Sequence, residues 1–216
     1  MPVLIFANGD LVNEQWVRPF LESPTAVIAA DGGAYHVLAA NHIPDIVIGD
    51  LDSLDTQTEQ ALAAQGARFV RFPAEKDETD LELALLYAAE HFPGEELLVF
   101  GVLGGRLDQT LANILLLAHP NLKGVMVRLV EEHQRAWLFR EVTAIHGRVG
   151  DKLSLIPLGG DAQIQSTQGL KWPLQEDVLS FGPARGVSNL ITAVPAEVRL
   201  RHGTVLCIHT DGSWER

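Results

Sequence analysis

The chain has 216 residues, 47% of them hydrophobic and 20% charged, which is enough to bury a sizeable core in one or two domains. Its formal net charge of −12 argues against a nucleic-acid partner, because binding to a phosphate backbone depends on clustered Lys and Arg. The N-terminal residues lack the basic region and cleavage site of a signal peptide, and no apolar run approaches the roughly 18 residues that span a membrane, so we expect a cytoplasmic protein without a membrane partner.

The first half of the chain alternates short apolar runs with stretches of helical periodicity. We expect strands over 3–7, 26–30, 46–49, 67–72, 97–101 and 124–130, with helices between them, including one over 13–21 and one over 55–64. This alternation is typical of an α/β domain with a doubly wound, mostly parallel sheet.

Polar segments, four of them containing glycine, follow five of these strands, at 8–10, 31–33, 49–53, 75–80 and 104–109. The carboxyl ends of parallel strands meet at one edge of a sheet, which is where ligands bind in such folds. Paired glycines between a strand and a helix allow a phosphate to approach the backbone, and a guanidinium group matches phosphate geometry. The sequence contains neither the dinucleotide fingerprint nor the GxxxxGK[ST] phosphate loop.

Asp50 and Asp52 directly follow the third apolar run and are two residues apart. Alternate residues of an extended segment point the same way, so both carboxylates can share one target. Hard oxygen ligands combined with phosphate oxygens are what Mg²⁺ prefers. The alternative is a polar turn that caps the next helix through Ser53 or Asp55. This stretch alone fits both interpretations.

A second acidic segment precedes the helix that we expect to begin after Thr79. Thr79 and Glu82 have the spacing of a capping box, which places Asp80 in the first helical turn. Asp77 and Asp80 either add a carboxylate to a metal site or interact only with the helix dipole.

After about residue 131 the helical periodicity disappears. Short strands separated by Gly and Pro, expected over 135–139, 152–156, 162–165, 178–181, 189–194, 197–200 and 204–208, indicate an all-β sandwich. We therefore place a domain boundary near 130–150 and predict an α/β domain over 1–135 and a β-sandwich domain over 136–216. Trp172, between a lysine and a proline, either stacks on a flat cationic heterocycle or, as its residue type alone favours, fills the sandwich core.

Five short motifs, spread in order over nearly the whole chain, resemble those of the thiamine pyrophosphokinase family. They are Asp31-Gly32-Gly33-Ala34, Gly49-Asp50-Leu51-Asp52-Ser53, Lys76-Asp77-Glu78-Thr79-Asp80, Gly104-Gly105-Arg106-Leu107-Asp108-Gln109, and Gly169-Leu170-Lys171-Trp172 with Ser188-Asn189. The resemblance implies an enzyme that transfers the diphosphoryl group of ATP to the hydroxyl group of thiamine, giving thiamine diphosphate and AMP. It also implies a homodimer that binds thiamine between the catalytic domain of one subunit and the β domain of the other.

The resemblance further implies a role for each matching residue. Asp50, Asp52 and Asp80 would hold Mg²⁺, and Asp108 would be a candidate for accepting the hydroxyl proton. The residues near ATP would be Asn8, Asp31, Gly32, Gly33, Lys76, Asp77 and Arg106. Those near thiamine would be Gln109, Trp172, Ser188 and Asn189.

Three other functions use some of the same residue types. A diphosphokinase of this architecture could act on another hydroxymethyl heterocycle. A phosphatase with an aspartyl nucleophile would form a phosphoenzyme at Asp50. A nucleotide-sensing module would bind ATP without forming AMP.

Overall fold

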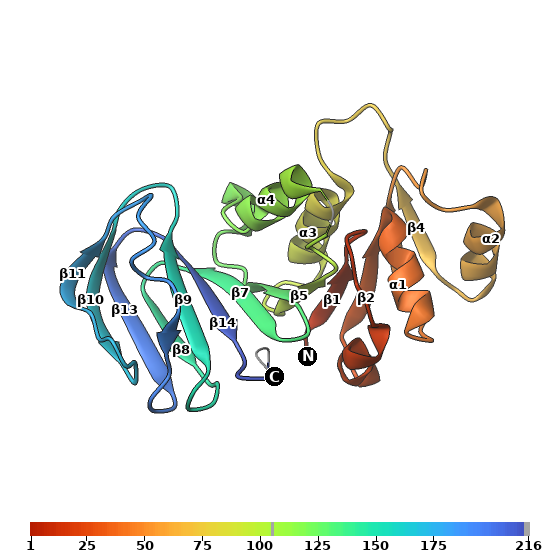
Figure 1. The fold of residues 1–216 in the computed structure, drawn as a ribbon. Coiled ribbons are helices and arrows are strands. Elements are labelled where there is room, and N and C mark those ends of the chain that lie inside the picture. The colour runs from red at the N-terminus through yellow and green to blue at the C-terminus, as the bar shows by residue number, and fades with distance from the viewer. Residues whose placement is uncertain (105, 214–216) are drawn as a thin grey trace. The chain divides into compact units, whose positions relative to one another are not determined.

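The computed structural model describes residues 1–104 and 106–213 (Figure 1). The chain packs into two units, Met1–Glu132 and a second that begins at His133. Within the described residues, no helix is both long and apolar enough to cross a membrane.

The first unit is built on a parallel sheet whose strands are β1 (Val3–Phe6), β2 (Ala26–Ala30), β3 (Ile46–Gly49), β4 (Arg68–Arg71), β5 (Leu97–Phe100) and β6 (Val127–Val130). Their order is β6-β5-β1-β2-β3-β4, and every neighbouring pair is parallel. Because β1 lies between β2 and β5, the strand order reverses there. In doubly wound sheets such a reversal marks the ligand-binding crevice.

Helices connect these strands (Figure 1). They are η1 (Glu14–Glu22), η2 (Asp31–Gly33), α1 (Ala34–Ala39), α2 (Thr56–Ala64), α3 (Asp80–His91), α4 (Leu107–Leu116) and η3 (Pro120–Leu122).

Both faces of the central strands are buried, which explains why these strands are apolar along their whole length. Leu4 and Phe6 of β1 pack on one face with Val17 of η1 and Val37 of α1. Alternate residues such as Ile5 point to the opposite face, where α3 packs against β1, β2 and β3. The predicted doubly wound sheet is confirmed.

One helix differs from its prediction. The segment expected as an amphipathic helix over 13–21 forms the 3₁₀ helix η1, which begins after Asn13 and contains Pro19. Proline has no backbone N–H to donate to the preceding turn, so the regular α-helical bonding cannot continue through it. The apolar spacing still identifies the buried face of this segment, because Val17 and Leu21 are buried.

The second unit is a sandwich of two sheets. One contains β12 (Asn189–Leu190), β9 (Lys152–Pro157), β14 (Val205–Thr210) and β7 (Gln134–Phe139) in that order. The other contains β11 (Gln175–Leu179), β10 (Ala162–Gln168), β13 (Ala196–His202) and β8 (Val142–Ile145). All pairings within these two sets are antiparallel.

Residues from both sets share one core, in which Trp137 and Leu155 pack in the same cluster as Ile164 and Val198. The predicted β-sandwich is therefore confirmed. The strand expected over 189–194 covers only Asn189–Leu190, because the N–H groups of Thr192 and Ala193 both donate to the carbonyl of Gly169, which turns the chain.

Candidate functional site

A cavity of about 620 Å³ lies at the carboxyl edge of the parallel sheet, where β1, β2, β3 and β5 end. It therefore occupies the place that the reversal of strand order marks for a ligand. The cavity brings together eight of the residues singled out from the sequence, namely Asn8, Asp31, Asp50, Asp52, Lys76, Asp80, Arg106 and Gln109.

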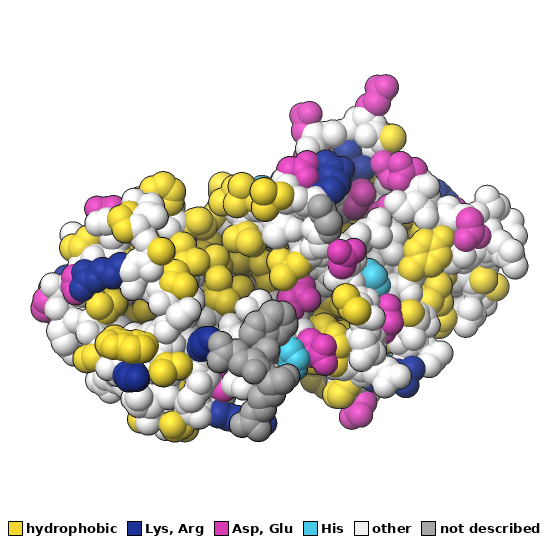
Figure 2. All heavy atoms as spheres, viewed as in Figure 1, with side chains coloured by type: hydrophobic (Ala, Val, Ile, Leu, Met, Phe, Trp, Pro, Cys, Tyr) yellow, Lys and Arg dark blue, Asp and Glu magenta, His cyan; other side chains and the backbone are white. Residues whose placement is uncertain are grey.

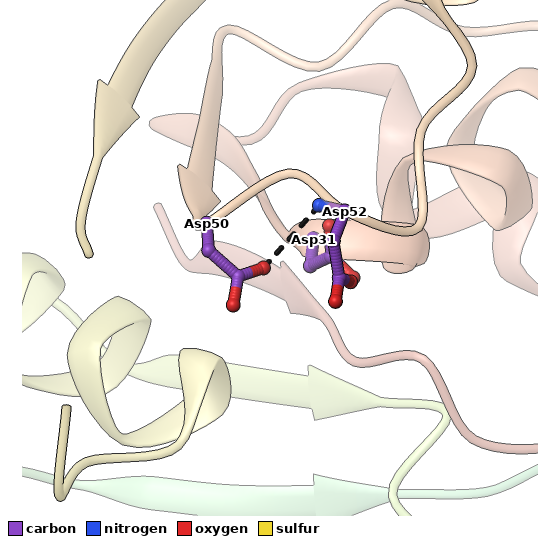
Figure 3. A group of neighbouring side chains, drawn as sticks. All are labelled: Asp31, Asp50 and Asp52. Carbon is purple, nitrogen blue, oxygen red and sulfur yellow. Dashed lines mark hydrogen bonds between the residues drawn. The ribbon is translucent and has the colours of Figure 1, made fainter. Parts of the chain in front are cut away.

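Three carboxylates form the acidic centre of this cavity. Asp31 follows β2, whereas Asp50 and Asp52 follow β3, and one ligand oxygen of each lies within 4.8 Å of the others (Figure 3). The N–H of Asp52 donates to Oδ1 of Asp50 at 3.3 Å, which holds the two residues of the loop together (Figure 3). The arrangement matches the chemistry of a hard divalent cation bound by a few carboxylates.

Asp31 gives the cation hypothesis its clearest structural support. Its residue is only 5% exposed, and its Oδ1 is buried without a hydrogen-bond partner among the described atoms. An unpartnered buried carboxylate is costly unless a cation or proton satisfies it. Asp31 also has a φ of +45°, a left-handed conformation that places it on the turn into η2. The resemblance implied that Asp31 lies near ATP, and in the structure its carboxylate lies close to those of Asp50 and Asp52.

The alternative interpretation, in which Ser53 or Asp55 caps the next helix, is confirmed for Asp55. Asp55 is the N-cap of α2, and its Oδ1 accepts the N–H of Thr58 at 2.8 Å. Asp50 and Asp52 are therefore not needed to cap α2.

Lys76 supplies a cation within the acidic group. Its Nζ lies 3.0 Å from Oδ1 of Asp80 and 3.4 Å from Oδ2 of Asp50, and its side chain is 11% exposed. Burial lowers the pKa of Lys76, but its contacts with Asp80 and Asp50 outweigh that effect and leave the pKa above its ordinary value. Burial is also the largest influence on Asp80 and raises its pKa, even though Lys76 opposes the shift.

Asp80 is positioned by the start of α3. Thr79 caps the helix, and its Oγ1 accepts the N–H of Glu82 at 3.2 Å, as the capping box predicts. The carboxylate of Glu82 lies 3.5 Å from His119. Asp77, expected near ATP, is exposed and is not among the described residues that line the cavity.

Gly32 and Gly33 lie behind the cavity lining. A Cβ on Gly33 would come within 2.0 Å of the carbonyl oxygen of Phe6, and one on Gly32 would come within 2.5 Å of Oδ1 of Asn8. These glycines allow η2 to approach the end of β1 closely, which brings Asn8 and Asp31 to the same wall.

The loop before α4 contributes a second cation. Arg106 pairs with Asp108 at 2.5 Å, and their side chains are 70% and 67% exposed. The hydrogen bond from Arg106 lowers the pKa of Asp108 below its ordinary value, and the pKa of Arg106 is raised in turn. Arg106 and Gln109 line the cavity, whereas Asp108 is not among its described lining residues. Gly105 of the same motif lies outside the described residues.

Three polar lining residues, Asp10, Thr110 and Asn113, were given no individual role from the sequence. Asp10 follows Asn8 and donates its N–H to the carbonyl of Leu103 at 2.7 Å, and Thr110 and Asn113 belong to α4. Asn113 is 8% exposed, and its Nδ2 donates to the carbonyl of Val102 at 2.8 Å. The sequence did contain a signal for Asn113, because it is a polar amide residue surrounded by apolar residues in a segment with helical spacing.

Trp172, Ser188 and Asn189 lie in the second unit. The interpretation of Trp172 as a core residue is wrong, because Trp172 is 53% exposed and Trp137 fills the core instead. The Nζ of Lys171 lies 4.8 Å from the centre of the Trp172 ring. Ser188 is exposed, with a φ of +61°. The exposed indole fits a role in binding better than a role in stability.

Comparison with known families matches both halves of the chain. The family described as "Thiamin pyrophosphokinase, catalytic domain" matches residues 17–129. The family described as "Thiamin pyrophosphokinase, vitamin B1 binding domain" matches residues 142–205.

Individual relatives agree with these matches. The thiamine pyrophosphokinase of Bacillus subtilis is 30% identical over 172 residues, which cover 79% of this chain and 80% of the relative. Thiamine pyrophosphokinase 2 of Oryza sativa subsp. japonica is 28% identical over 199 residues, covering 80% of this chain and 73% of the relative.

Solved structures show the same fold. The crystal structure of thiamine pyrophosphokinase from Bacillus subtilis superimposes with a TM-score of 0.87 at 28% identity, covering 98% of this chain and 100% of that chain. The crystal structure of yeast thiamin pyrophosphokinase superimposes with a TM-score of 0.81 at 18% identity, covering 97% of this chain and 86% of that chain.

Proposed function

Because the chain belongs to the thiamine pyrophosphokinase family, we propose that it transfers the diphosphoryl group of ATP to the hydroxyl group of thiamine, giving thiamine diphosphate and AMP. The observation that carries this proposal is the cavity at the reversal of strand order, which combines three clustered carboxylates with Lys76 and Arg106. We assign ATP and metal binding to residues 1–135 and thiamine binding to residues 136–216. We place the reaction in the cytoplasm.

Mg²⁺ fits the donor set of the cavity, since carboxylate oxygens are its preferred protein ligands and Asp31 Oδ1 is buried without a partner. We propose that Asp31, Asp50 and Asp52 hold the ion and that Asp80, which lines the same cavity, adds to the acidic group. When bound, Mg²⁺ would neutralise charge on the phosphate oxygens, which bare carboxylates would repel.

In the proposed reaction, the hydroxyl oxygen of thiamine attacks the β-phosphorus of ATP. The bond from that phosphorus to the oxygen shared with the α-phosphate breaks, and AMP leaves with the electron pair. Little covalent chemistry is left to the protein, so its side chains act by positioning and electrostatic stabilisation. Lys76 and Arg106 would offset the negative charge of the phosphates, and the side chain of Asn8 would orient them.

Asp108 is our candidate for accepting the hydroxyl proton. Its lowered pKa keeps it ionised and ready to accept, although it also makes Asp108 a weak base. A weak base suffices here, because the transition state of phosphoryl transfer is loose and demands little activation of the nucleophile.

For thiamine, we propose that Trp172 of one subunit stacks on the substrate while Gln109 of the other subunit borders it, with Ser188 as a polar contact. This arrangement requires a homodimer, and two sets of exposed apolar residues support one. Leu107, Leu111 and Leu115 of α4 are 82%, 54% and 46% exposed, and Figure 2 shows hydrophobic side chains over this helix. The second unit exposes Trp172, Phe181 and Val187. A twofold symmetric dimer could bury both apolar sets at once, because each subunit offers both.

A single assay tests the proposal. AMP formation from ATP and Mg²⁺ is measured with thiamine, without it, and with a pterin or nucleoside alcohol in its place. We expect AMP and thiamine diphosphate to form in equal amounts when thiamine is present, and no AMP to form without thiamine or with the other alcohols. AMP formation with a different alcohol would reassign the substrate, and ATP binding without AMP would indicate a sensing module. A phosphoenzyme at Asp50 would indicate the phosphatase instead.

A further inference from the structure

The side chain of Asn189 is bonded to the backbone of Trp172, which lies 17 residues earlier in the chain. Its Oδ1 accepts the N–H of Trp172 at 3.1 Å, and its Nδ2 donates to the carbonyl of Trp172 at 2.7 Å. The same Oδ1 also accepts the N–H of Leu190 at 2.9 Å. One amide group therefore satisfies both backbone polar groups of Trp172.

These bonds extend a short antiparallel pairing. Leu170 forms a bridge with Ile191, and the N–H of Lys171 donates to the carbonyl of Leu190 at 2.9 Å. At Trp172 the pairing is continued by the side chain of Asn189 and not by another backbone group. Pro173 follows and has no N–H with which to continue it.

The indole of Trp172 depends on this anchoring. The residue is 53% exposed, so packing fixes the ring only weakly. Within the described chain, its ring contacts the flexible side chain of Lys171, whose Nζ lies 4.8 Å from the ring centre. The direction of the indole is consequently set by the backbone at Trp172, and that backbone is held by Asn189.

We propose that Asn189 is a positioning residue that acts on thiamine recognition through Trp172 and does not contact thiamine itself. This inference rests on the proposed function for the role of Trp172. The three bonds occupy Oδ1 twice and Nδ2 once, so a direct contact with substrate has only one remaining N–H available. Ser188, next to it, has a hydroxyl group without a hydrogen bond within the described chain and remains the polar contact.

A double-mutant cycle tests the proposal. Asn189→Ala should raise KM for thiamine by about tenfold. It removes several hydrogen bonds that hold the backbone of Trp172, and the loss of each one changes an equilibrium constant by about a few-fold. KM for ATP should stay unchanged. If Asn189 acts through Trp172, the double variant Asn189→Ala/Trp172→Ala should be no worse than Trp172→Ala alone. Effects that add would mean an independent contact with thiamine and would overturn the proposal.

A second measurement needs no substrate. The fluorescence of Trp172 is obtained by subtracting the spectrum of Trp172→Phe from that of the intact chain, and the same subtraction is made in the Asn189→Ala background. We expect Asn189→Ala to increase quenching of Trp172 by acrylamide. Gln165→Ala, which removes an exposed amide side chain in β10, is the matched control and should leave it unchanged.

The kinetic experiment and the fluorescence experiment can fail independently of each other. If the wild type forms no AMP with thiamine, the proposed function is wrong, while the fluorescence arm still tests whether Asn189 holds Trp172. Unchanged quenching in Asn189→Ala would overturn the positioning role even in an active enzyme.

Discussion

Asp31 combines three properties that rarely coincide in one residue: burial, a left-handed backbone and an oxygen without a hydrogen bond among the described atoms. In a metal-free protein this combination is unfavourable. Such a cost persists when the residue serves a ligand, and here two further carboxylates lie beside it.

The first prediction concerns this side chain. Asp31→Asn keeps its shape and removes its charge, so the metal-free variant should melt no lower than the wild type. The Tm of the wild type should rise on adding Mg²⁺, because a ligand that binds only the folded state stabilises it. The Tm of Asp31→Asn should not respond, and its turnover should fall by about 100-fold or more. Tm is followed by circular dichroism.

Glu90→Gln serves as the control for this charge change, because Glu90 is an exposed carboxylate on α3 outside the cavity lining. Its response to Mg²⁺ should match that of the wild type. A full Mg²⁺ response in Asp31→Asn would contradict the metal assignment.

Most individual residues of the site could be predicted, because the order of strands and helices along the chain places the polar segments after parallel strands at one edge of the sheet. The sequence could not reveal which carboxylates cluster. The grouping of Asp31 with Asp50 and Asp52, and the pairing of Asp80 with Lys76, depend on side-chain directions at strand ends. The exposure of Trp172 could not be predicted for a similar reason. Its residue type favours burial, but the packing of the folded chain determines whether the side chain is buried.

At the scale of elements, Asp151 ties the start of β9 to the end of β14. It is 3% exposed and accepts the N–H groups of Arg148 at 2.7 Å and Gly212 at 2.9 Å. His209 of β14 lies 2.8 Å from its carboxylate. Burial by itself raises the pKa of Asp151, but these bonds outweigh it and leave the pKa below its ordinary value of 3.8.

The second prediction follows from the direction of this shift. A carboxyl group whose pKa is lowered by folding stabilises the protein above its unfolded pKa, and that stabilisation is lost as the pH falls through the folded value. Asp151→Asn should therefore lower the free energy of unfolding by about 2 kcal/mol or more at pH 7. The difference from the wild type should shrink below pH 4. Urea denaturation at both pH values measures it, and an equal difference at both would contradict the explanation.

The central strands of the parallel sheet, β1, β2 and β3, were predictable because they are buried on both faces and therefore have continuous apolar sequences. The strand β8 was not predicted, because only Ile145 of its residues is buried and the alternation is too weak to detect. The outward direction of the leucines of α4 was equally hidden, since spacing reveals an apolar stripe but not what covers it.

The third prediction tests that stripe. Leu111→Glu places a charge in the middle of the exposed leucines and should weaken a dimer that buries them. The measured mass should fall from about twice the 23.6 kDa of one chain towards a single chain at micromolar concentration. Analytical ultracentrifugation gives the mass. Gln57→Glu on α2 adds the same charge to an exposed polar position and should not change it.

At the scale of the whole molecule, the question is whether one active site draws on two chains. Our fourth prediction is that two inactive variants rescue each other. Asp52→Ala damages the first unit and Trp172→Ala damages the second. In a mixed dimer, one shared site then receives both defects and the other receives none.

Random mixing makes half of the dimers mixed, so the recovered activity should be about a quarter of the wild-type value. It is measured at a thiamine concentration where each variant alone is nearly inactive, after the subunits have exchanged. No recovery, with mixed dimers present, would mean that each site belongs to a single chain.

The helix α4 faces two ways, and this has an energetic consequence. Gln109 and Asn113 line the cavity, whereas Leu107, Leu111 and Leu115 are exposed on the same short helix. Any ligand that steadies α4 from the cavity side also steadies the leucines. If these leucines form the proposed dimer contact, thermodynamic reciprocity requires that dimer formation strengthen nucleotide binding by the factor by which the nucleotide strengthens dimer formation. Dilution of the protein would then weaken its binding of ATP, and abundant ATP would favour the dimer.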